Sequence, residues 1–324
     1  MIQRRLALTG LLGLAACAPT VRGLGTAPSG FCGPRLDTDG LVTVDGLRLP
    51  MQVWAPGGEP WAVMIALHGM NDYSNAFALG GPWWAAQGIA TYAYDQRGFG
   101  RAAARGYWPG ADALVQDLRT AVALARQRHP KALIAVLGHS MGGAVAIHAF
   151  GSREPPAADH LILAAPAVWG WSRQALPNRL ALWVTAHTAP GARLSAPDWL
   201  VRRVQATDNV EVLRAMSRDP NMIFKTRVDA VYGLVGLMQL ADRELKAVKA
   251  PVFYLYGARD KIIPKAATRH AVRGLKTADR LAYYSQGYHL LNRDLQAPKV
   301  WGDIESYLRD PSAPFPSGAP NVIS

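Results

Sequence analysis

The fold is decided by the stretch Leu133-Ile134-Ala135-Val136-Leu137-Gly138-His139-Ser140-Met141-Gly142-Gly143 and the apolar run 144–150 that follows it. The apolar residues before the first glycine predict a buried strand, and the run after the last glycine predicts a buried helix. The G-x-S-x-G turn between them is a nucleophile elbow, which forces its serine into strained backbone geometry and presents the hydroxyl above a sheet. Gly138 and Gly142 are needed because side chains there would collide with neighbouring backbone.

Around this turn, strand-like runs alternate with helices of amphipathic spacing, as a parallel sheet with both faces covered requires. The chain therefore predicts an α/β fold with a mostly parallel, doubly wound sheet. A hairpin signal at Asp45-Gly46 precedes the sheet, and helices are expected at 114–125 and 298–308. The expected strands are 63–67, 90–94, 133–137, 161–164, 252–256 and 281–284.

The 324 residues are expected to form one large domain at 39–309. Only the stretch from 170 to about 248 breaks the alternation, because it shows several helix patterns and no clear strand, and it predicts an inserted helical cap. Residues 17–38, rich in Pro, Gly, Thr and Ala, suit a flexible tether. The proline-rich tail 310–324 is expected to be disordered.

The first residues read as an export signal followed by a lipid-attachment site. A basic start precedes the apolar stretch 6–16 and then Cys17, and so short a run cannot cross a hydrocarbon core of about 30 Å. The end of the stretch, Leu14-Ala15-Ala16-Cys17, resembles the bacterial lipobox, in which the cysteine is acylated after cleavage. Residues 1–16 are therefore expected to be a lipoprotein signal peptide, and acyl chains on Cys17 to hold the protein at a membrane surface.

A plain signal peptide and a wrongly assigned start codon are the alternatives. Ala18 stands where an aspartate is associated with inner-membrane retention, which favours an exported bacterial lipoprotein that faces the periplasm. Cys32 is then the one ordinary cysteine left, so we expect neither an intramolecular disulfide nor a zinc site built from cysteines.

Charge does not point to a second class of partner. The formal balance is +12, and removal of Arg4 and Arg5 leaves 33 basic against 23 acidic residues, or +10. The basic residues are spread along the chain with no nucleic-acid module around them, which favours a solvated basic surface over a nucleic-acid partner. Half of the residues are apolar and 18% are charged, which favours neither a disordered chain nor a multi-span membrane protein.

A serine hydroxyl becomes a nucleophile when a base takes its proton, and a carboxylate must orient that base. At such an elbow the chain order is serine, acid, histidine. Asp260 follows the strand 252–256, and His289 follows the strand 281–284. Both lie at the carboxyl ends of strands, where open α/β sheets place their sites. Ser140, Asp260 and His289 are therefore the predicted catalytic triad.

The other candidates fall in less suitable places. Asp95 precedes the elbow and Asp208 lies in the cap, although both compete with Asp260 as the acid. The remaining histidines after the elbow suit structural roles, and they are His148, His160, His187 and His270.

The oxyanion formed on attack needs two N–H donors placed in advance. Met141, the residue after the nucleophile, supplies one. The second is assigned to Met70, in His68-Gly69-Met70 after the strand 63–67, because Gly69 lets the backbone bend there.

Five segments together resemble the monoacylglycerol lipase and lysophospholipase branch of the α/β hydrolases, also called serine aminopeptidase S33 or hydrolase-4. They are His68-Gly69-Met70, Asp95-Gln96-Arg97-Gly98-Phe99-Gly100, Gly138 to Gly143, Gly257-Ala258-Arg259-Asp260 and Tyr288-His289. The resemblance covers roughly residues 40–309 and implies the α/β-hydrolase fold, the same triad and the same two oxyanion donors. The chain departs from the family pattern after His68-Gly69, where Met70-Asn71-Asp72-Tyr73-Ser74 replaces x-G-E-H-S. It departs again where Arg101-Ala102 replaces the serine that often follows the Arg-Gly-x-Gly run.

The resemblance implies hydrolysis of carboxylic esters, with no cofactor and no metal. Large apolar side chains in the cap would suit an acyl chain if they line the site, or form the core of the cap if they do not. They are Trp171, Trp183, Trp199, Leu180, Val231, Leu234 and Met238, with Trp169 at the edge. The expected substrates are lipid-like esters such as monoacylglycerols or lysophospholipids. Alternatives are peptide, amide or thioester cleavage by the same triad, and a non-catalytic lipid-binding lipoprotein; the oligomeric state stays open.

Overall fold

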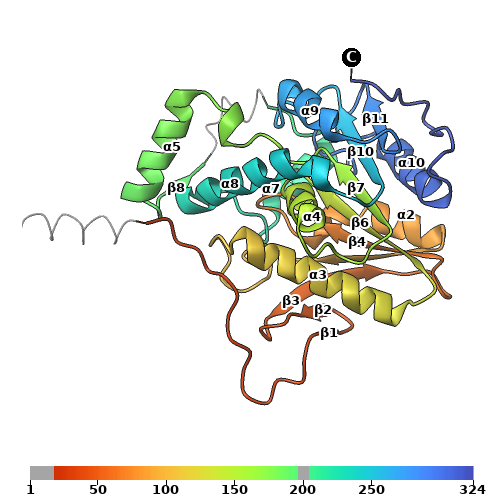
Figure 1. Cartoon of the computed structure of the whole chain (residues 1–324), viewed down its shortest axis with the longest axis horizontal. Coiled ribbons are helices and arrows are strands. Elements are labelled where there is room, and N and C mark those ends of the chain that lie inside the picture. The colour runs from red at the N-terminus through yellow and green to blue at the C-terminus, as the bar shows by residue number, and fades with distance from the viewer. Residues whose placement is uncertain (1–17, 196–203, 324) are drawn as a thin grey trace, which may run out of the picture.

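The computed structural model describes residues 18–195 and 204–323. Within these ranges the chain forms a sheet of nine strands in the order β1-β2-β3-β5-β4-β6-β7-β10-β11, with helices on both faces (Figure 1). The strands from β5 to β11 are parallel, whereas β1, β2 and β3 pair antiparallel at one edge. This confirms the predicted α/β class and the mostly parallel, doubly wound sheet.

The strands lie where the sequence placed them. The hairpin joins β2 (Gly40–Val42) to β3 (Arg48–Trp54), and Gly46 in its turn has a φ of 78°, a conformation that glycine adopts without strain. The other strands are β1 (Arg35–Leu36), β4 (Ala62–Leu67), β5 (Ile89–Tyr94), β6 (Leu133–His139), β7 (His160–Ala164), β10 (Val252–Gly257) and β11 (Arg280–Tyr284).

Both faces of the parallel sheet are buried, because successive side chains of a strand point to opposite sides. In β4 the odd-numbered side chains pack with α3 (Ala111–Arg128), α4 (Met141–Gly151) and α8 (Val228–Glu244). The even-numbered ones pack with α2 (Gly80–Ala86) and α10 (Ala297–Arg309). The shorter elements of the domain are η1 (Ser74–Phe77), η3 (Leu245–Ala247), α9 (Lys265–Ala271) and η4 (Val272–Gly274).

The cap is smaller than the predicted 170–248. Its described elements are η2 (Trp171–Arg173), α5 (Leu176–Thr188), α7 (Val210–Arg218) and a ribbon of β8 (Arg193–Leu194) with β9 (Thr226–Arg227). The predicted boundary is corrected because α8 packs along α4, and Val235 and Leu237 lie in the core of the sheet domain. Apolar helix spacing does not distinguish a cap helix from one that covers a sheet.

The tail from residue 310, predicted to be disordered, packs against the sheet domain. Phe315 stacks on Phe253 with 4.8 Å between ring centroids. Tyr283 in β11 donates its backbone N–H to the Pro320 carbonyl (3.0 Å), and Arg280 donates to the Ala313 carbonyl (3.0 Å). The prolines that suggested disorder also reduce the backbone entropy that such a segment loses when it docks.

The predicted signal peptide 1–16 and Cys17 lie outside the described residues. The predicted tether 17–38 is packed in part, because Val21 forms a β-bridge with Trp108 and β1 begins at Arg35. Within the described ranges, no helix combines the length and the apolar character that a membrane crossing needs.

Candidate active site

Ser140 stands between β6 and α4 in the conformation that the elbow predicted. Its backbone has φ of 52° and ψ of −115°, an uncommon combination for a residue with a side chain. The turn is held on both sides, since the Ser140 N–H donates to the Ala164 carbonyl (3.1 Å) and the Ser140 carbonyl accepts from Ala144 (3.1 Å) and Ala167 (2.9 Å). Only 8% of Ser140 is exposed, so the strained residue is fixed by its surroundings.

Two glycines allow the backbone segments around the elbow to meet. A Cβ on Gly138 would lie 2.6 Å from the Gly142 carbonyl oxygen, and a Cβ on Gly142 would lie 2.3 Å from the Leu67 carbonyl oxygen. Both distances are well below carbon–oxygen contact. The predicted reason for these glycines is therefore confirmed.

Asp260 and His289 meet above the sheet. His289 Nδ1 lies 2.8 Å from Asp260 Oδ2, and both residues are almost fully buried. The other carboxylate oxygen, Asp260 Oδ1, accepts the backbone N–H groups of Ile262 (2.7 Å) and Ile263 (3.0 Å). Because each oxygen has its own partners, the carboxylate is held in one orientation and leaves His289 Nε2 as the ring nitrogen available to a substrate or to Ser140.

The loops after β10 and β11 are joined through their backbones, and this brings the acid and the histidine together. The Arg259 N–H donates to the Gly287 carbonyl (2.8 Å), and the Ala258 N–H donates to the Tyr284 carbonyl (2.9 Å). A Cβ on Gly257 would lie 2.5 Å from the Gly287 carbonyl oxygen. Asp260 is therefore positioned against His289 by main-chain contacts that side-chain identity does not reveal.

His139, the residue before Ser140, brings His289 beside the elbow. The two imidazole rings lie 5.0 Å apart, and His139 Nε2 donates to the His289 carbonyl oxygen (3.1 Å). Burial, with a smaller effect of the nearby His289 charge, lowers the pKa of His139 well below its ordinary value, so this ring is neutral. The prediction did not assign this role to His139; its place inside the elbow motif was the available signal.

The loop that carries Met70 is fixed by buried polar contacts. His68 Nε2 accepts the Gln96 backbone N–H (2.8 Å), and His68 Nδ1 donates to the Gly69 carbonyl (2.8 Å). The Gln96 side-chain amide donates to the His68 carbonyl (2.7 Å). A Cβ on Gly69 would lie 3.3 Å from the Ser140 Cβ. The peptide that leads into Met70 therefore passes directly over the serine.

Met141 begins α4, so its N–H is among the first N–H groups of a helix, which have no acceptor within the helix. The N–H groups of Met70 and Met141 thus belong to two segments that meet at Ser140. Their role as the oxyanion donors stays a prediction.

The competing acids have other partners. Asp95 pairs with Arg101 (2.9 Å) and accepts the Ser74 N–H (3.0 Å). Burial alone would raise the pKa of Asp95, but the hydrogen bonds from Arg101 and Ser74 outweigh it and lower that pKa. Asp208 accepts the Leu295 N–H (2.8 Å). Both carboxylates therefore hold loops in place.

The other histidines after the elbow contact groups away from Ser140. His148 pairs with Glu244 (2.6 Å), His160 with the Tyr307 hydroxyl (3.2 Å), and His187 with the Trp183 carbonyl (2.7 Å). His270 lies 4.0 Å from Asp242. Within residues 18–195 and 204–323, no cluster of three or more His, Cys, Asp or Glu side chains is arranged to hold a metal ion.

The apolar cap residues divide between two environments. Trp171, Leu180 and Trp183 line a surface hollow of about 370 Å³. Leu234 and Met238, on α8, pack in or against the core of the sheet domain instead. Trp199 lies outside the described residues. Leu234 and Met238 therefore contribute to the core, as the alternative interpretation held, whereas Leu180 and Trp183 on α5 are exposed.

Comparison with known proteins shows which sequences and structures this chain resembles. The sequence profile of the family described as serine aminopeptidase, S33, matches residues 58–296. A monoacylglycerol lipase of Mycolicibacterium smegmatis is 28% identical over 280 residues, which cover 82% of this chain and 94% of that protein. The human monoglyceride lipase is 25% identical over 276 residues, which cover 84% and 88%.

A similar fold occurs in the crystal structure of the Paleococcus ferrophilus monoacylglycerol lipase. The two chains superpose with a TM-score of 0.67 at 20% identity, over 80% of this chain and 98% of that one. At this identity the likeness concerns the fold.

Proposed function

Since the chain belongs to the serine aminopeptidase S33 family of α/β hydrolases, we propose that it is a serine hydrolase that cleaves carboxylic esters of lipid-like substrates through an acyl-enzyme on Ser140. One observation carries the proposal: a His289–Asp260 pair at 2.8 Å contacts His139, the residue before a serine held at φ 52° on a strand–helix turn. An imidazole oriented by a carboxylate next to a strained serine is the arrangement that activates a hydroxyl.

In the acylation step Ser140 Oγ attacks the ester carbonyl carbon while His289 Nε2 takes the hydroxyl proton. Asp260 keeps the other ring proton on Nδ1 and stabilises the imidazolium. The tetrahedral oxyanion accepts hydrogen bonds from the N–H groups of Met70 and Met141. When the intermediate collapses, the alcohol leaves with the proton from His289, and the acyl group remains on Ser140.

Water completes the reaction by the same groups in the reverse roles. His289 takes a proton from the water as it attacks the acyl carbon, and then returns it to Ser140 Oγ as the carboxylic acid is released. Since Ser140, Asp260 and His289 are each no more than 8% exposed, the charges that develop in these steps are shielded from bulk water, which strengthens their interactions.

We propose a monoacylglycerol or lysophospholipid as the substrate class. The relatives named monoacylglycerol lipase and monoglyceride lipase support this choice. The test is a panel of p-nitrophenyl esters of increasing chain length together with monoacylglycerols. Turnover should favour medium or long chains, and a strict preference for acetate would contradict a lipid-like substrate.

Peptide or amide cleavage is the rival on the same triad. Aminoacyl arylamides should be turned over far more slowly than acyl esters, and the opposite ratio would favour a peptidase. A fluorophosphonate probe should label the protein, and Ser140→Ala should abolish both labelling and ester turnover. A protein that binds lipid without catalysis would show neither, even with Ser140 intact.

We also propose that the protein is exported and anchored through acylation of Cys17, with the domain facing the periplasm. The basic start, the apolar stretch 6–16 and the lipobox-like Leu14-Ala15-Ala16-Cys17 support it. Metabolic labelling with a radioactive fatty acid should mark the protein, and Cys17→Ala should remove the label. Labelling that survives this substitution would contradict the assignment.

A further inference from the structure

We propose that residues Val21–Gly25 form a strap that clamps the N-terminal tether to the foot of the cap, so that a lipid on Cys17 holds the apolar face of α5 against the bilayer. The proposal rests on the anchoring proposed above, and the experiment below separates the two. It goes further because it states which segment of this chain fixes the orientation of the anchored domain.

The strap is bound to the domain at both of its ends. Val21 forms a parallel β-bridge with Trp108, and the Arg22 N–H donates to the Trp108 carbonyl (2.8 Å). At the other end, the Gly25 N–H donates to Asp45 Oδ2 (2.7 Å). A tether that served only as a flexible spacer would not need these contacts.

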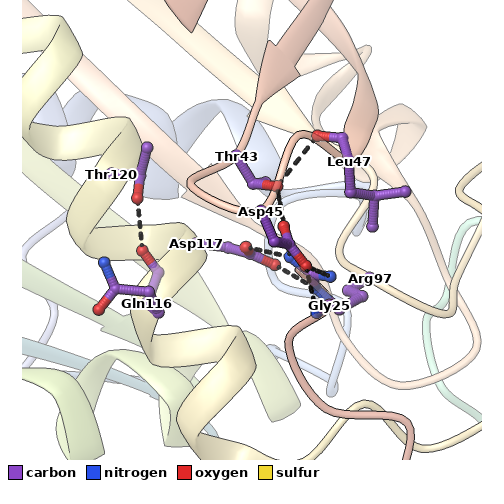
Figure 2. Close-up of polar contacts among 8 residues, drawn as sticks. All are labelled: Gly25, Thr43, Asp45, Leu47, Arg97, Gln116, Asp117 and Thr120. Carbon is purple, nitrogen blue, oxygen red and sulfur yellow. Dashed lines mark hydrogen bonds and ion pairs between the residues drawn. The ribbon is translucent and has the colours of Figure 1, made fainter. Parts of the chain in front are cut away.

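The acceptor at the Gly25 end is a rigid, charged group. Figure 2 shows Asp45 facing Arg97, which donates to both Asp45 oxygens (2.8 and 3.0 Å) and to both oxygens of Asp117 (3.0 and 2.8 Å). Burial alone would raise the pKa of Asp45, but hydrogen bonds from Arg97 and Thr43 outweigh it and lower that pKa. The strap therefore docks on a carboxylate that stays ionised and fixed, and such hydrogen bonds are stronger than neutral ones.

The docking site is continuous with the cap. The Tyr107 ring lies 4.2 Å from the guanidinium carbon of Arg22 and 4.3 Å from that of Arg227. Arg227 belongs to β9, which pairs with β8 directly after α5. Figure 1 agrees, because the N-terminal end of the coloured chain lies beside α5 and β8.

This position limits how far the lipid can be from the cap. Val21 lies four positions after Cys17, and a fully extended chain spans about 3.3–3.6 Å per residue, or about 14 Å here. The acylated residue must therefore lie within about 14 Å of the foot of the cap. A bilayer surface at that distance is within reach of α5.

The surface of α5 is suited to that contact. Leu176, Leu180, Trp183 and Val184 are exposed by 70%, 60%, 50% and 43%. Their spacing of i, i+4, i+7 and i+8 places them on one face of the helix. Exposed Arg179 lies beside them and can meet anionic head groups. An apolar face next to an acyl anchor is expected to enter the bilayer interface, where each buried apolar side chain adds to binding.

The test uses the mature chain from Cys17 with Cys32→Ser, coupled through Cys17 to a maleimide lipid in phosphatidylethanolamine–phosphatidylglycerol vesicles. This chemical anchor makes the result independent of acylation in the cell. A 20-residue Gly/Ser linker is inserted between Ala18 and Pro19, upstream of the strap. The matched control carries the same linker between Gly33 and Pro34, where the strap stays next to the lipid.

The photo-crosslinking amino acid p-benzoylphenylalanine, placed at position 180 instead of Leu180, reports contact of α5 with lipid. Placed at position 299 on α10 instead of Lys299, it serves as the negative control. Crosslinking at position 180 should be strong in the parent and in the downstream insertion. It should fall about tenfold in the upstream insertion, because effective concentration decreases with roughly the 3/2 power of linker length. Turnover of vesicle-bound monoacylglycerol should fall with it, whereas turnover of a soluble p-nitrophenyl ester should not change.

Equal crosslinking in the two insertions, or no crosslinking at position 180 in the parent, would overturn the strap. Absence of turnover on the soluble ester in every variant would instead overturn the proposed hydrolase, and the crosslinking pattern would still report the orientation. The point variant Gly25→Pro removes the N–H that Asp45 accepts, and it should reduce crosslinking in the same direction as the upstream insertion.

Discussion

Replacement of Asp260 by asparagine tests the proposed division of labour between the two oxygens of its carboxylate. Asn is almost the same size, so the effect depends on which amide atom faces His289. Ile262 and Ile263 both donate backbone N–H groups to Asp260 Oδ1. The amide oxygen of Asn must take that place, and its NH2 group then faces His289 Nδ1.

The opposite orientation would set the NH2 group against two buried N–H donors. Each unsatisfied donor costs about 1–3 kcal/mol, or about 2–6 kcal/mol for both. With the NH2 group toward the ring, His289 Nδ1 must accept a hydrogen bond, so the ring proton moves to Nε2. That tautomer cannot take the proton of Ser140, and a change of this kind lowers kcat by about 10⁴-fold, or about 5.5 kcal/mol.

The assay is ester turnover together with the rate of fluorophosphonate labelling, measured for wild type, Asp260→Asn and Asp260→Ala. The free energy of unfolding of Asp260→Asn should lie within about 1 kcal/mol of the wild-type value, because the variant keeps both backbone hydrogen bonds. Its activity should still be lost. A stably folded Asp260→Asn variant that retains more than about a tenth of wild-type kcat would refute the tautomer argument and remove Asp260 from the triad.

Three further changes have directions set by the structure. Gln96→Leu removes the side-chain hydrogen bond to the His68 carbonyl (2.7 Å). We expect kcat to fall several-fold while the free energy of unfolding changes by no more than about 1 kcal/mol. An unchanged kcat would show that Gln96 is not a positioning residue. Gly142→Ala should disrupt the elbow, because its Cβ would lie 2.3 Å from a carbonyl oxygen of β4. Gly236→Ala is the matched control, since its Cβ meets nothing within 4 Å, and it should stabilise α8 by up to about 1 kcal/mol in thermal unfolding. Equal effects of the two substitutions would contradict the close approach at Gly142. Burial raises the pKa of Asp294 from 3.8 to about 6, so its contribution to stability is lost as pH rises from about 4 to 6. In urea unfolding, the free energy of unfolding of Asp294→Asn should therefore rise by roughly 1–3 kcal/mol relative to wild type between pH 4 and pH 7. A difference between the two proteins that does not change with pH would contradict the raised pKa.

The elements that the sequence predicted well are those defined by local patterns. Apolar runs found the six parallel strands from β4 to β11, and Gly138 and Gly142 identified the sharp turn at Ser140. Asp260 and His289 could be chosen because each follows a predicted strand in the required chain order. These inferences depend on periodicity and on residue order, both of which are visible in one chain.

The features that the sequence did not predict depend on contacts between distant residues. Phe315 lies in a proline-rich tail, but it stacks on Phe253, which is more than 60 positions away. The apolar spacing of α8 predicts a cap helix, but α8 packs on α4 in the sheet domain. The hydrogen bond from His139 to the His289 carbonyl joins the end of β6 to the loop after β11. No local pattern distinguishes such docked segments from exposed ones with the same composition.

Strand order explains why Asp260 and His289 can meet only where two loops come into close contact. In the sheet, β10 lies two strands from β6 and β11 lies three strands away. With about 4.8 Å between neighbouring strands, these are about 10 and 14 Å. His289 must therefore reach back across the end of β10, and the loop that carries it passes over the loop of Asp260.

That crossing is possible only if the two main chains come close. A Cβ on Gly257 would lie 2.5 Å from the Gly287 carbonyl oxygen, so no residue with a side chain fits at position 257. Because the loops touch here, Asp260 lies between the strand of the nucleophile and the strand of the base, where its carboxylate can face the ring. The same crossing brings the His289 carbonyl to His139 Nε2 (3.1 Å). The order of strands thus places Asp260 where it faces the His289 ring, and the close approach at Gly257 brings the His289 loop to the residue before Ser140.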